Sequence, residues 1–333
     1  MISRKIIYTN WRFQMEINYP PYTITDKMFN LATSIMEKIG ETNYFESLNG
    51  FPELKRKTRI QSIYSSLTIE NNQLSLLQVE EIINRKTVIV APKDIQEVKN
   101  AYKAYEEIDY ISPYSIDDLK KIQGILTFAI EDDCGKFRNH GEAVYDGDIQ
   151  IFMAPPHRMV PTLMDNLFNW MNEVKEKVNP LILSSIFHYE FVFIHPFSDG
   201  NGRTARLWQT SILAHWKNLF KYIPIESIIK KHQEEYYTAI QNCNNIGNSN
   251  EFIEFMLKVI YEAVDEMILA SNQETTQEKI INLIKKNPAI TQVEMAKTLD
   301  LTRDEISYNI KVLKEKGIME KVGFTKNEIW KTL

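Results

Sequence analysis

The residues best suited to chemistry lie close together in the segment FVFIHPFSDGNGRTAR, which runs from Phe191 to Arg206. Pro196 disfavours the helical conformation at the residue before it, so the apolar helix predicted from Leu181 should end at His195 and leave its imidazole at a turn. An imidazole has an ordinary pKa of about 6.5, which suits a general base that takes the proton of a hydroxyl nucleophile. This histidine is therefore the candidate catalytic base.

The glycine-rich turn that follows predicts an anion site. Residues Gly200–Gly202 precede a run of helix-forming residues, with Asp199 in reach of a capping position. The free N–H groups and the partial positive charge at such a helix start favour an anionic ligand. Arg203 and Arg206 are three residues apart, so both guanidinium groups project from neighbouring positions on the first turn and can grip a polyphosphate.

Asp199 supplies a single hard oxygen ligand beside this anion site. Magnesium keeps most of its waters and binds proteins through one or two carboxylates together with substrate phosphates. A lone aspartate next to an anion site therefore suits Mg²⁺ with a nucleotide better than calcium or zinc. The segment lacks the Lys-Ser/Thr ending of a P-loop, so we expect the nucleotide to be held differently from that of a P-loop ATPase.

The segment as a whole matches the pattern HPFx(D/E)GNGRxxR and resembles the signature of the Fic family, and the resemblance extends from about Ser62 to Leu257. Proteins of that family are mostly helical. Most members with the intact signature transfer AMP from Mg-ATP to a Ser, Thr or Tyr hydroxyl of a target protein and release pyrophosphate. The resemblance therefore implies a protein adenylyltransferase, and retention of the second glycine, Gly202, favours AMP over other transferred groups.

The resemblance also implies a role for each signature residue. His195 would deprotonate the target hydroxyl, Asp199 would bind Mg²⁺, and Phe197 would anchor the loop. The phosphates of ATP would be held by two sets of residues: Gly200, Asn201 and Gly202 for the α- and β-phosphates, and Arg203 and Arg206 for the β- and γ-phosphates.

Two residues downstream resemble the adenine side of the family's nucleotide pocket. Tyr237 would stack on the base, and Asn244 would hydrogen-bond to it. The alternative is structural, because the pair Tyr236 and Tyr237 lies on an apolar helix and is as readily part of a core as of a pocket wall.

Upstream, Ser66 and Glu70 are four residues apart and share one face of a predicted helix. A glutamate at a helix C-terminus is poorly placed against the helix dipole. With Asn71 these residues match the motif (S/T)xxxE(G/N), which resembles the family's inhibitory motif. The resemblance implies that Glu70 pairs with Arg206 and denies it to the γ-phosphate. In some Fic enzymes this glutamate instead orients a water that removes AMP from the modified target, and that alternative stays open.

The elements that must position these residues are predicted to be mainly helical. Capping signals at Ser75 and Ser115 open amphipathic helices. Between Gly135 and Pro155 the helical period vanishes, and apolar groups on both sides of Asp146-Gly147-Asp148 predict a β-hairpin. By resemblance, residues 143–155 would be the flap that receives the target protein by strand addition.

The last part of the chain predicts a separate module. After a polar linker, capping boxes at Thr275, Thr291 and Thr302 each open a short amphipathic helix, and an alternating segment follows Gly317. This order resembles a winged helix-turn-helix. From Thr275 onward there are 11 Lys and Arg against 8 Asp and Glu, whereas the rest of the chain has 28 against 36. A DNA-binding regulator, or a protein-docking module, therefore stays open as a function of another class.

The sequence thus predicts three regions: an N-terminal helical region at 1–110 with an inhibitory helix at about 54–71, a Fic core at 111–270 and a winged helix at 275–333. The only two cysteines, Cys134 and Cys243, exclude a disulfide framework or a Cys-based zinc site. No stretch approaches the roughly 18 apolar residues of a membrane span, so we expect a cytoplasmic protein without a membrane partner. The expected partners are ATP and a target protein, and the identity of the target and the existence of a homodimer stay open.

Overall fold

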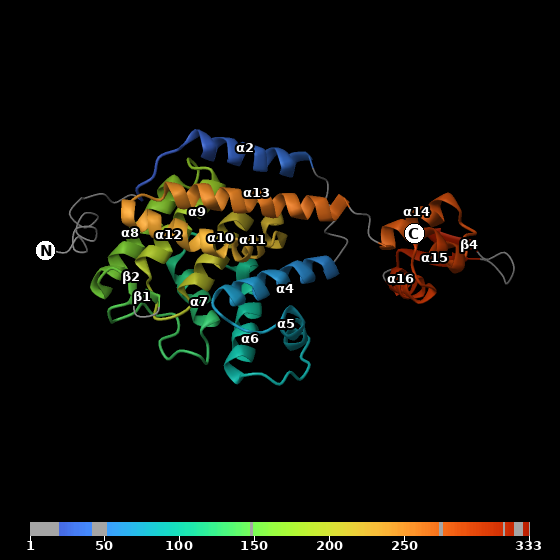
Figure 1. Cartoon of the computed structure of the whole chain (residues 1–333), viewed down its shortest axis with the longest axis horizontal. Helices are drawn as coiled ribbons and strands as arrows, with labels where there is room; N and C mark the ends of the chain where they lie inside the picture. Colours follow the sequence, from blue (N-terminus) through green and yellow to red (C-terminus); the bar gives the residue numbers. More distant parts are fainter. Residues whose placement is uncertain are drawn as a thin grey trace. The chain divides into compact units, whose positions relative to one another are not determined.

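The computed structural model describes residues 20–41, 52–146, 149–272, 276–315, 317–322 and 329–332. The chain divides into two compact units, Met1–Met267 and Ile268–Leu333 (Figure 1). The expected mainly α-helical fold is confirmed. None of the helices in the described ranges is both long and apolar enough to cross a membrane.

The described part of the first unit is built from helices of 7 to 23 residues with a few short 3-10 turns. The α-helices are α2 (Asp26–Glu41), α4 (Pro52–Ile69), α5 (Leu76–Ile83), α6 (Pro92–Glu106), α7 (Ile116–Leu126), α8 (Val160–Val174), α9 (Pro180–Ile194), α10 (Asn201–Trp216), α11 (Ile225–Lys231), α12 (Gln233–Ile246) and α13 (Asn250–Asn272). The capping serines predicted at Ser75 and Ser115 accept hydrogen bonds from the first turns of α5 and α7.

Helices α9 and α10 form the centre of this unit. Nearly every side chain of α9 is buried, including polar ones such as Ser184 and His188, so this helix has no solvent face. A mostly apolar helix that is buried on all sides belongs inside a core. Helix α10 packs along it, and Trp208 of α10 lies against Phe168 and Phe187. Because the signature segment joins these two helices, the core fixes both ends of the candidate site.

The predicted hairpin is confirmed by strands β1 (Ala143–Asp146) and β2 (Ile149–Met153), which pair antiparallel. The register shifts between Val144 and Tyr145, where β2 contributes one extra residue, Ile151, between the partners Phe152 and Gln150. Beyond the strands, the Ala154 N–H donates to the carbonyl oxygen of Glu142 at 3.1 Å and extends the pairing by one step. The tip residues 147 and 148 lie outside the described residues.

The second unit has the predicted winged-helix architecture. Its elements are α14 (Thr276–Lys286), α15 (Gln292–Leu299), α16 (Arg303–Glu315), β3 (Met319–Val322) and β4 (Ile329–Thr332). The capping boxes at Thr291 and Thr302 both form, whereas Thr275 lies outside the described residues. Trp330 closes the core, and its indole N–H donates to the Ile290 carbonyl oxygen at 2.8 Å.

Candidate active site

His195 lies where α9 ends, in the left-handed conformation with φ 50° and ψ 60°. The prediction that Pro196 ends the helix here is borne out, because the chain leaves the right-handed region at the residue before the proline. The amide of His195 still closes the last turn by donating to the Phe191 carbonyl oxygen at 2.9 Å. The imidazole is therefore carried by the rigid end of a buried helix.

The environment of His195 keeps its imidazole neutral. Burial lowers its pKa below the ordinary value of 6.5, although the nearby carboxylates of Glu142 and Glu70 act in the opposite direction. A base must be unprotonated to accept a proton, so a lowered pKa leaves this side chain ready for that role at neutral pH.

Arg138, which the sequence analysis missed, holds the loop around His195. Its Nε donates to the His195 carbonyl oxygen at 2.7 Å, and its Nη2 donates to that of Pro155 at 2.6 Å. Its backbone N–H donates to the Pro196 carbonyl oxygen at 2.9 Å. One buried side chain thus joins His195 to the segment that follows the hairpin. No sequence pattern marks an arginine that bonds only to backbone carbonyl groups.

The turn before α10 is held by Asn201. Its Oδ1 accepts from the Phe197 N–H at 3.0 Å, and its Nδ2 donates to the Phe197 carbonyl oxygen at 2.7 Å. The amide side chain is therefore bonded inside the loop through both its oxygen and its nitrogen. The predicted anchor Phe197 is fully buried and packs against Phe137 and Phe191.

The expectation that Asp199 caps α10 is corrected by the structure. The N-cap is Gly200, whose φ of 78° is a left-handed conformation that glycine adopts without strain. A Cβ at Gly200 would also come within 3.0 Å of the Thr127 methyl group. Asp199 stands one residue earlier, where its carboxylate accepts from the Gly200 N–H.

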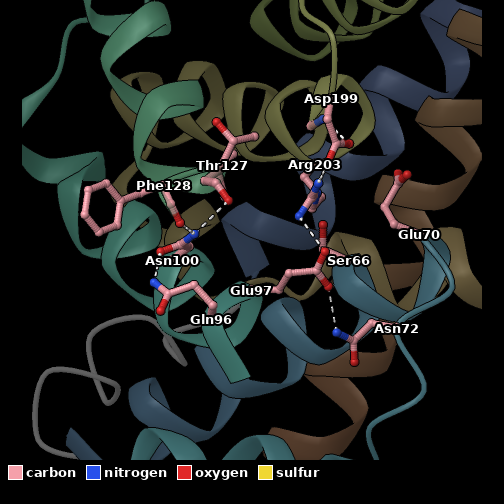
Figure 2. Close-up of polar contacts among 12 residues, drawn as sticks. Ser66, Glu70, Asn72, Gln96, Glu97, Asn100, Thr127, Phe128, Asp199 and Arg203 are labelled. Carbon is pink, nitrogen blue, oxygen red and sulfur yellow. Dashed lines mark hydrogen bonds and ion pairs between the residues drawn. The ribbon is translucent and has the colours of Figure 1, made fainter. Parts of the chain in front are cut away.

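Arg203 lies between two carboxylates. Its Nη2 is 2.8 Å from Asp199 Oδ2, and its Nη1 is 3.4 Å from Glu97 Oε1 on α6 (Figure 2). Only 5% of the arginine side chain is exposed. The sequence analysis missed Glu97, because no local spacing connects it with a residue more than a hundred positions away.

Arg206 is the more buried of the two signature arginines, with 1% of its side chain exposed. Its Nε donates to Ser66 Oγ at 3.0 Å, and its Nη2 donates both to the Ser66 carbonyl oxygen at 3.0 Å and to Glu70 Oε1 at 2.8 Å. Burial disfavours the charge of Arg206, but Glu70 outweighs this effect and raises the pKa above its ordinary value. The structure thus brings together Ser66 of α4, Glu70 directly after that helix, and the second signature arginine.

Gly202 permits the close approach of Glu70. A Cβ on Gly202 would lie 2.2 Å from Glu70 Oε1 and 3.1 Å from an Arg206 terminal nitrogen. Any larger residue at this position would have to displace the carboxylate. Glu70 therefore stands directly over the helix start that the sequence predicts to be an anion site.

The turn that presents Glu70 needs a left-handed residue directly after the glutamate. Asn71 has φ 65°, and the N–H of Asn72 reaches back to the Leu67 carbonyl oxygen at 3.1 Å. This is the geometry of a helix C-terminus closed by a left-handed residue, for which Gly and Asn are the favoured types. It gives a physical reason for the Gly or Asn in the motif.

The two predicted adenine contacts lie on α12. Tyr236 is the buried member of the tyrosine pair, whereas Tyr237 is 48% exposed and its hydroxyl donates to the Ile69 carbonyl oxygen of α4 at 3.3 Å. Asn244 Oδ1 accepts from the Tyr189 hydroxyl at 2.9 Å. Both predicted residues therefore have protein partners, and their contact with adenine stays a prediction.

Asp199 is the residue suited to a metal ion here. Burial raises its pKa, but Arg203 and the Gly200 amide outweigh burial and bring the pKa below its ordinary value, so the carboxylate is ionised. Within the described ranges, no group of three or more His, Cys, Asp or Glu side chains could hold a metal ion. A single ionised carboxylate fits Mg²⁺, which takes its other ligands from water and substrate phosphates.

Comparison with known proteins agrees with this geometry. Residues 113–213 match the Fic/DOC family model, and residues 273–318 match a winged helix-turn-helix DNA-binding model. The crystal structure of a Fic family protein from Desulfovibrio desulfuricans is 35% identical, with a TM-score of 0.73, and the match covers 95% of this chain and 98% of that one. The structure of Fic-1 from Caenorhabditis elegans, 23% identical, has the same fold at a TM-score of 0.61 over 75% of this chain and 73% of that one.

Curated relatives are similar over a shorter share of their own length. The protein adenylyltransferase Fic of Culex quinquefasciatus is 29% identical over 67% of this chain and 44% of the relative. The protein adenylyltransferase fic-1 of Caenorhabditis elegans is 26% identical over 76% of this chain and 49% of the relative. The chain therefore spans about half the length of these curated relatives.

The doubly bonded amide of Asn201 predicts a stability effect. Substitution of Asn201 by Ala leaves the buried N–H and carbonyl group of Phe197 without partners, so we expect the free energy of unfolding to fall by about 2–4 kcal/mol. Urea unfolding followed by circular dichroism measures it. Asn242→Ala is the matched control, because that amide bonds only to Glu251 at the surface. Equal stabilities for the two variants would contradict this account of the loop.

Proposed function

The chain belongs to the Fic family, and from this premise we propose that it is a protein adenylyltransferase that transfers AMP from Mg-ATP to a hydroxyl side chain of a target protein. The observation that carries the proposal is the placing of His195, neutral and fixed at the end of α9, beside the glycine-rich start of α10 with its two buried arginines. The curated relatives named protein adenylyltransferase support the same reaction.

In the proposed reaction, the start of α10 holds the polyphosphate. The backbone N–H groups of Gly200, Asn201 and Gly202 and the guanidinium groups of Arg203 and Arg206 would bind the phosphate oxygens. Mg²⁺, with Asp199 as its protein ligand, would neutralise phosphate charge when bound. The hairpin β1–β2 would align the target chain by strand addition.

His195 would then act on the target hydroxyl. Its neutral imidazole accepts the hydroxyl proton while the oxygen attacks the α-phosphorus. A bond forms between that oxygen and the α-phosphorus, and the bond from the α-phosphorus to the bridging oxygen breaks. Pyrophosphate leaves with the electron pair, and the target keeps AMP.

We propose further that the enzyme is autoinhibited in the described conformation. Glu70 pairs with Arg206 and lies over Gly202, so it takes the place of a phosphate oxygen in both contacts. ATP that binds without Arg206 would not be aligned for attack on its α-phosphorus. The removal of AMP through Glu70 is the alternative role of the same carboxylate.

A second candidate function concerns the winged helix. Arg303, Ser307 and Lys311 are exposed and lie on one face of α16, at intervals of four residues. The carboxylate of Glu305, on the first turn of α16, accepts a hydrogen bond from the Thr302 hydroxyl at 2.7 Å and is thus engaged in the helix cap. This face, together with the match to DNA-binding winged helices, favours contact with DNA as the alternative.

The main proposal is tested with labelled ATP. Incubation of the Glu70→Gly protein with α-labelled ATP should leave label on the protein itself, whereas γ-labelled ATP should leave none. Label retained only from the γ position would indicate a kinase-like reaction and would overturn the proposal.

His195→Ala should abolish transfer while Mg-ATP binding persists. Loss of a general base costs roughly 10²–10⁴-fold in rate, and the phosphate contacts lie on other residues. Because burial lowers the pKa of His195, transfer by Glu70→Gly should fall to half of its maximum only at a pH below 6.5. Self-labelling rates at saturating Mg-ATP between pH 5 and 8 measure both effects. Undiminished labelling of His195→Ala, or a half-maximal rate at a pH above 6.5, would contradict the assignment.

Glu70→Gly should raise self-adenylylation by about tenfold or more, because the freed Arg206 gains a charge-assisted contact with the γ-phosphate that aligns the α-phosphate. Arg206→Ala in the same background should cancel the gain. The matched control is Asn71→Gly, which suits the positive φ and leaves Glu70 in place. A folded but inactive Glu70→Gly protein would refute autoinhibition and favour the removal of AMP.

A further inference from the structure

Arg203 has a partner that the reaction described above does not use. Glu97 Oε1 lies 3.4 Å from Arg203 Nη1, and the glutamate in turn accepts a hydrogen bond at Oε2 from Asn72 Nδ2 at 2.8 Å (Figure 2). Asn72 is buried, and 13% of the Glu97 side chain is exposed. The three side chains form a chain of contacts from the inhibitory turn to the signature helix.

Asn72 is held rigidly at its end of this chain. Its Oδ1 accepts from the Leu74 N–H at 3.1 Å, and its own N–H donates to the Leu67 carbonyl oxygen. The bond at Oδ1 fixes the orientation of the amide, in which Nδ2 donates to Glu97. The turn that places Glu70 over Gly202 therefore also places a donor on Glu97.

Helix α6, which carries Glu97, is fixed against the end of α7. On the next turn, Asn100 donates through Nδ2 to the carbonyl oxygens of Leu126 at 3.2 Å and Phe128 at 2.7 Å, where α7 ends. Gln96 donates to Asn100 Oδ1 at 2.8 Å. Figure 2 shows this row of polar side chains on α6 beside Arg203. The backbone that carries Glu97 is thereby tied to the core.

Glu97 and Glu70 differ in where they stand relative to the anion site. Glu70 is 37% exposed and covers Gly202, in the place predicted for phosphate. Glu97 is more buried and contacts Nη1 of Arg203, whereas Asp199, also 37% exposed, contacts Nη2. Glu97 therefore lies behind the guanidinium, on the protein side.

We propose that Asn72 and Glu97 are positioning residues that fix the guanidinium of Arg203 for the polyphosphate. The proposal rests on the function proposed above. A long arginine side chain loses rotamer freedom when it grips a ligand, so a fixed guanidinium binds at lower entropic cost. The inhibitory turn then has two opposite effects: Glu70 blocks one arginine, and Asn72 prepares the other through Glu97.

The test uses Glu70→Gly as the active background. Glu97→Gln and Asn72→Asp should each raise the KM for ATP by about tenfold, as expected for the loss of one charge-assisted contact, and change kcat by less than about threefold. The double variant should raise the KM for ATP by less than the two single effects combined, because the glutamine amide can donate to the aspartate. Calorimetric affinity should fall for Mg-ATP and stay constant for AMP, which lacks the phosphates that Arg203 would hold.

Glu107→Gln is the matched control, because its carboxylate pairs with Lys121 at the surface beyond the end of α6. It should leave KM, kcat and both affinities unchanged. If the Glu70→Gly protein transfers no α-label, the proposed function is refuted but the positioning of Arg203 is not. The affinity for Mg-ATP still tests that positioning. An unchanged or tighter Mg-ATP affinity in Glu97→Gln, or an equal loss for AMP, would overturn the positioning role; a tighter affinity would make Glu97 a competitor of phosphate.

Discussion

The buried charge of Arg206 is the constraint on which the arrangement of this protein depends. A guanidinium with almost no exposed surface needs a close polar partner, because an unpaired buried charge costs several kcal/mol. In the described conformation that partner is Glu70, supported by the hydroxyl and carbonyl oxygens of Ser66. In the proposed function, the same buried charge would bind phosphate, so Glu70 and phosphate would compete for one guanidinium.

The way α4 docks is consistent with this competition. Ile63 and Leu67 are buried, but the helix also presents serines at intervals of three and four residues. Ser62 donates to the buried carboxylate of Glu226 at 2.8 Å, and Ser65 lies 3.0 Å from the Ser227 hydroxyl on α11. Such polar contacts specify one orientation of a helix, and their groups can return to water if the helix moves. The docking surface thus fixes where Glu70 points.

The signature loop itself is stabilised from outside the signature. Asn201 closes the loop on Phe197, and Arg138 ties the carbonyl group of His195 to Pro155, directly after the hairpin. The proposed base and the proposed docking strands therefore share one rigid support. A fixed distance between them is what transfer to a bound hydroxyl requires, since misplacement of about 1 Å costs much of the rate.

The sequence alone determined what depends on neighbouring residues. Pro196 ends α9, glycines form the turn into α10, capping boxes begin the short helices, and a change of period marks the hairpin. The fold class and the signature could be predicted because these preferences act over a few residues. The tertiary structure decided the partners. Glu97 meets Arg203 across 106 positions and Arg138 meets His195 across 57, and no local pattern encodes either contact. Even the cap of α10 is Gly200 and not Asp199, and a Cβ at Gly200 would come within 3.0 Å of Thr127, a residue 73 positions away.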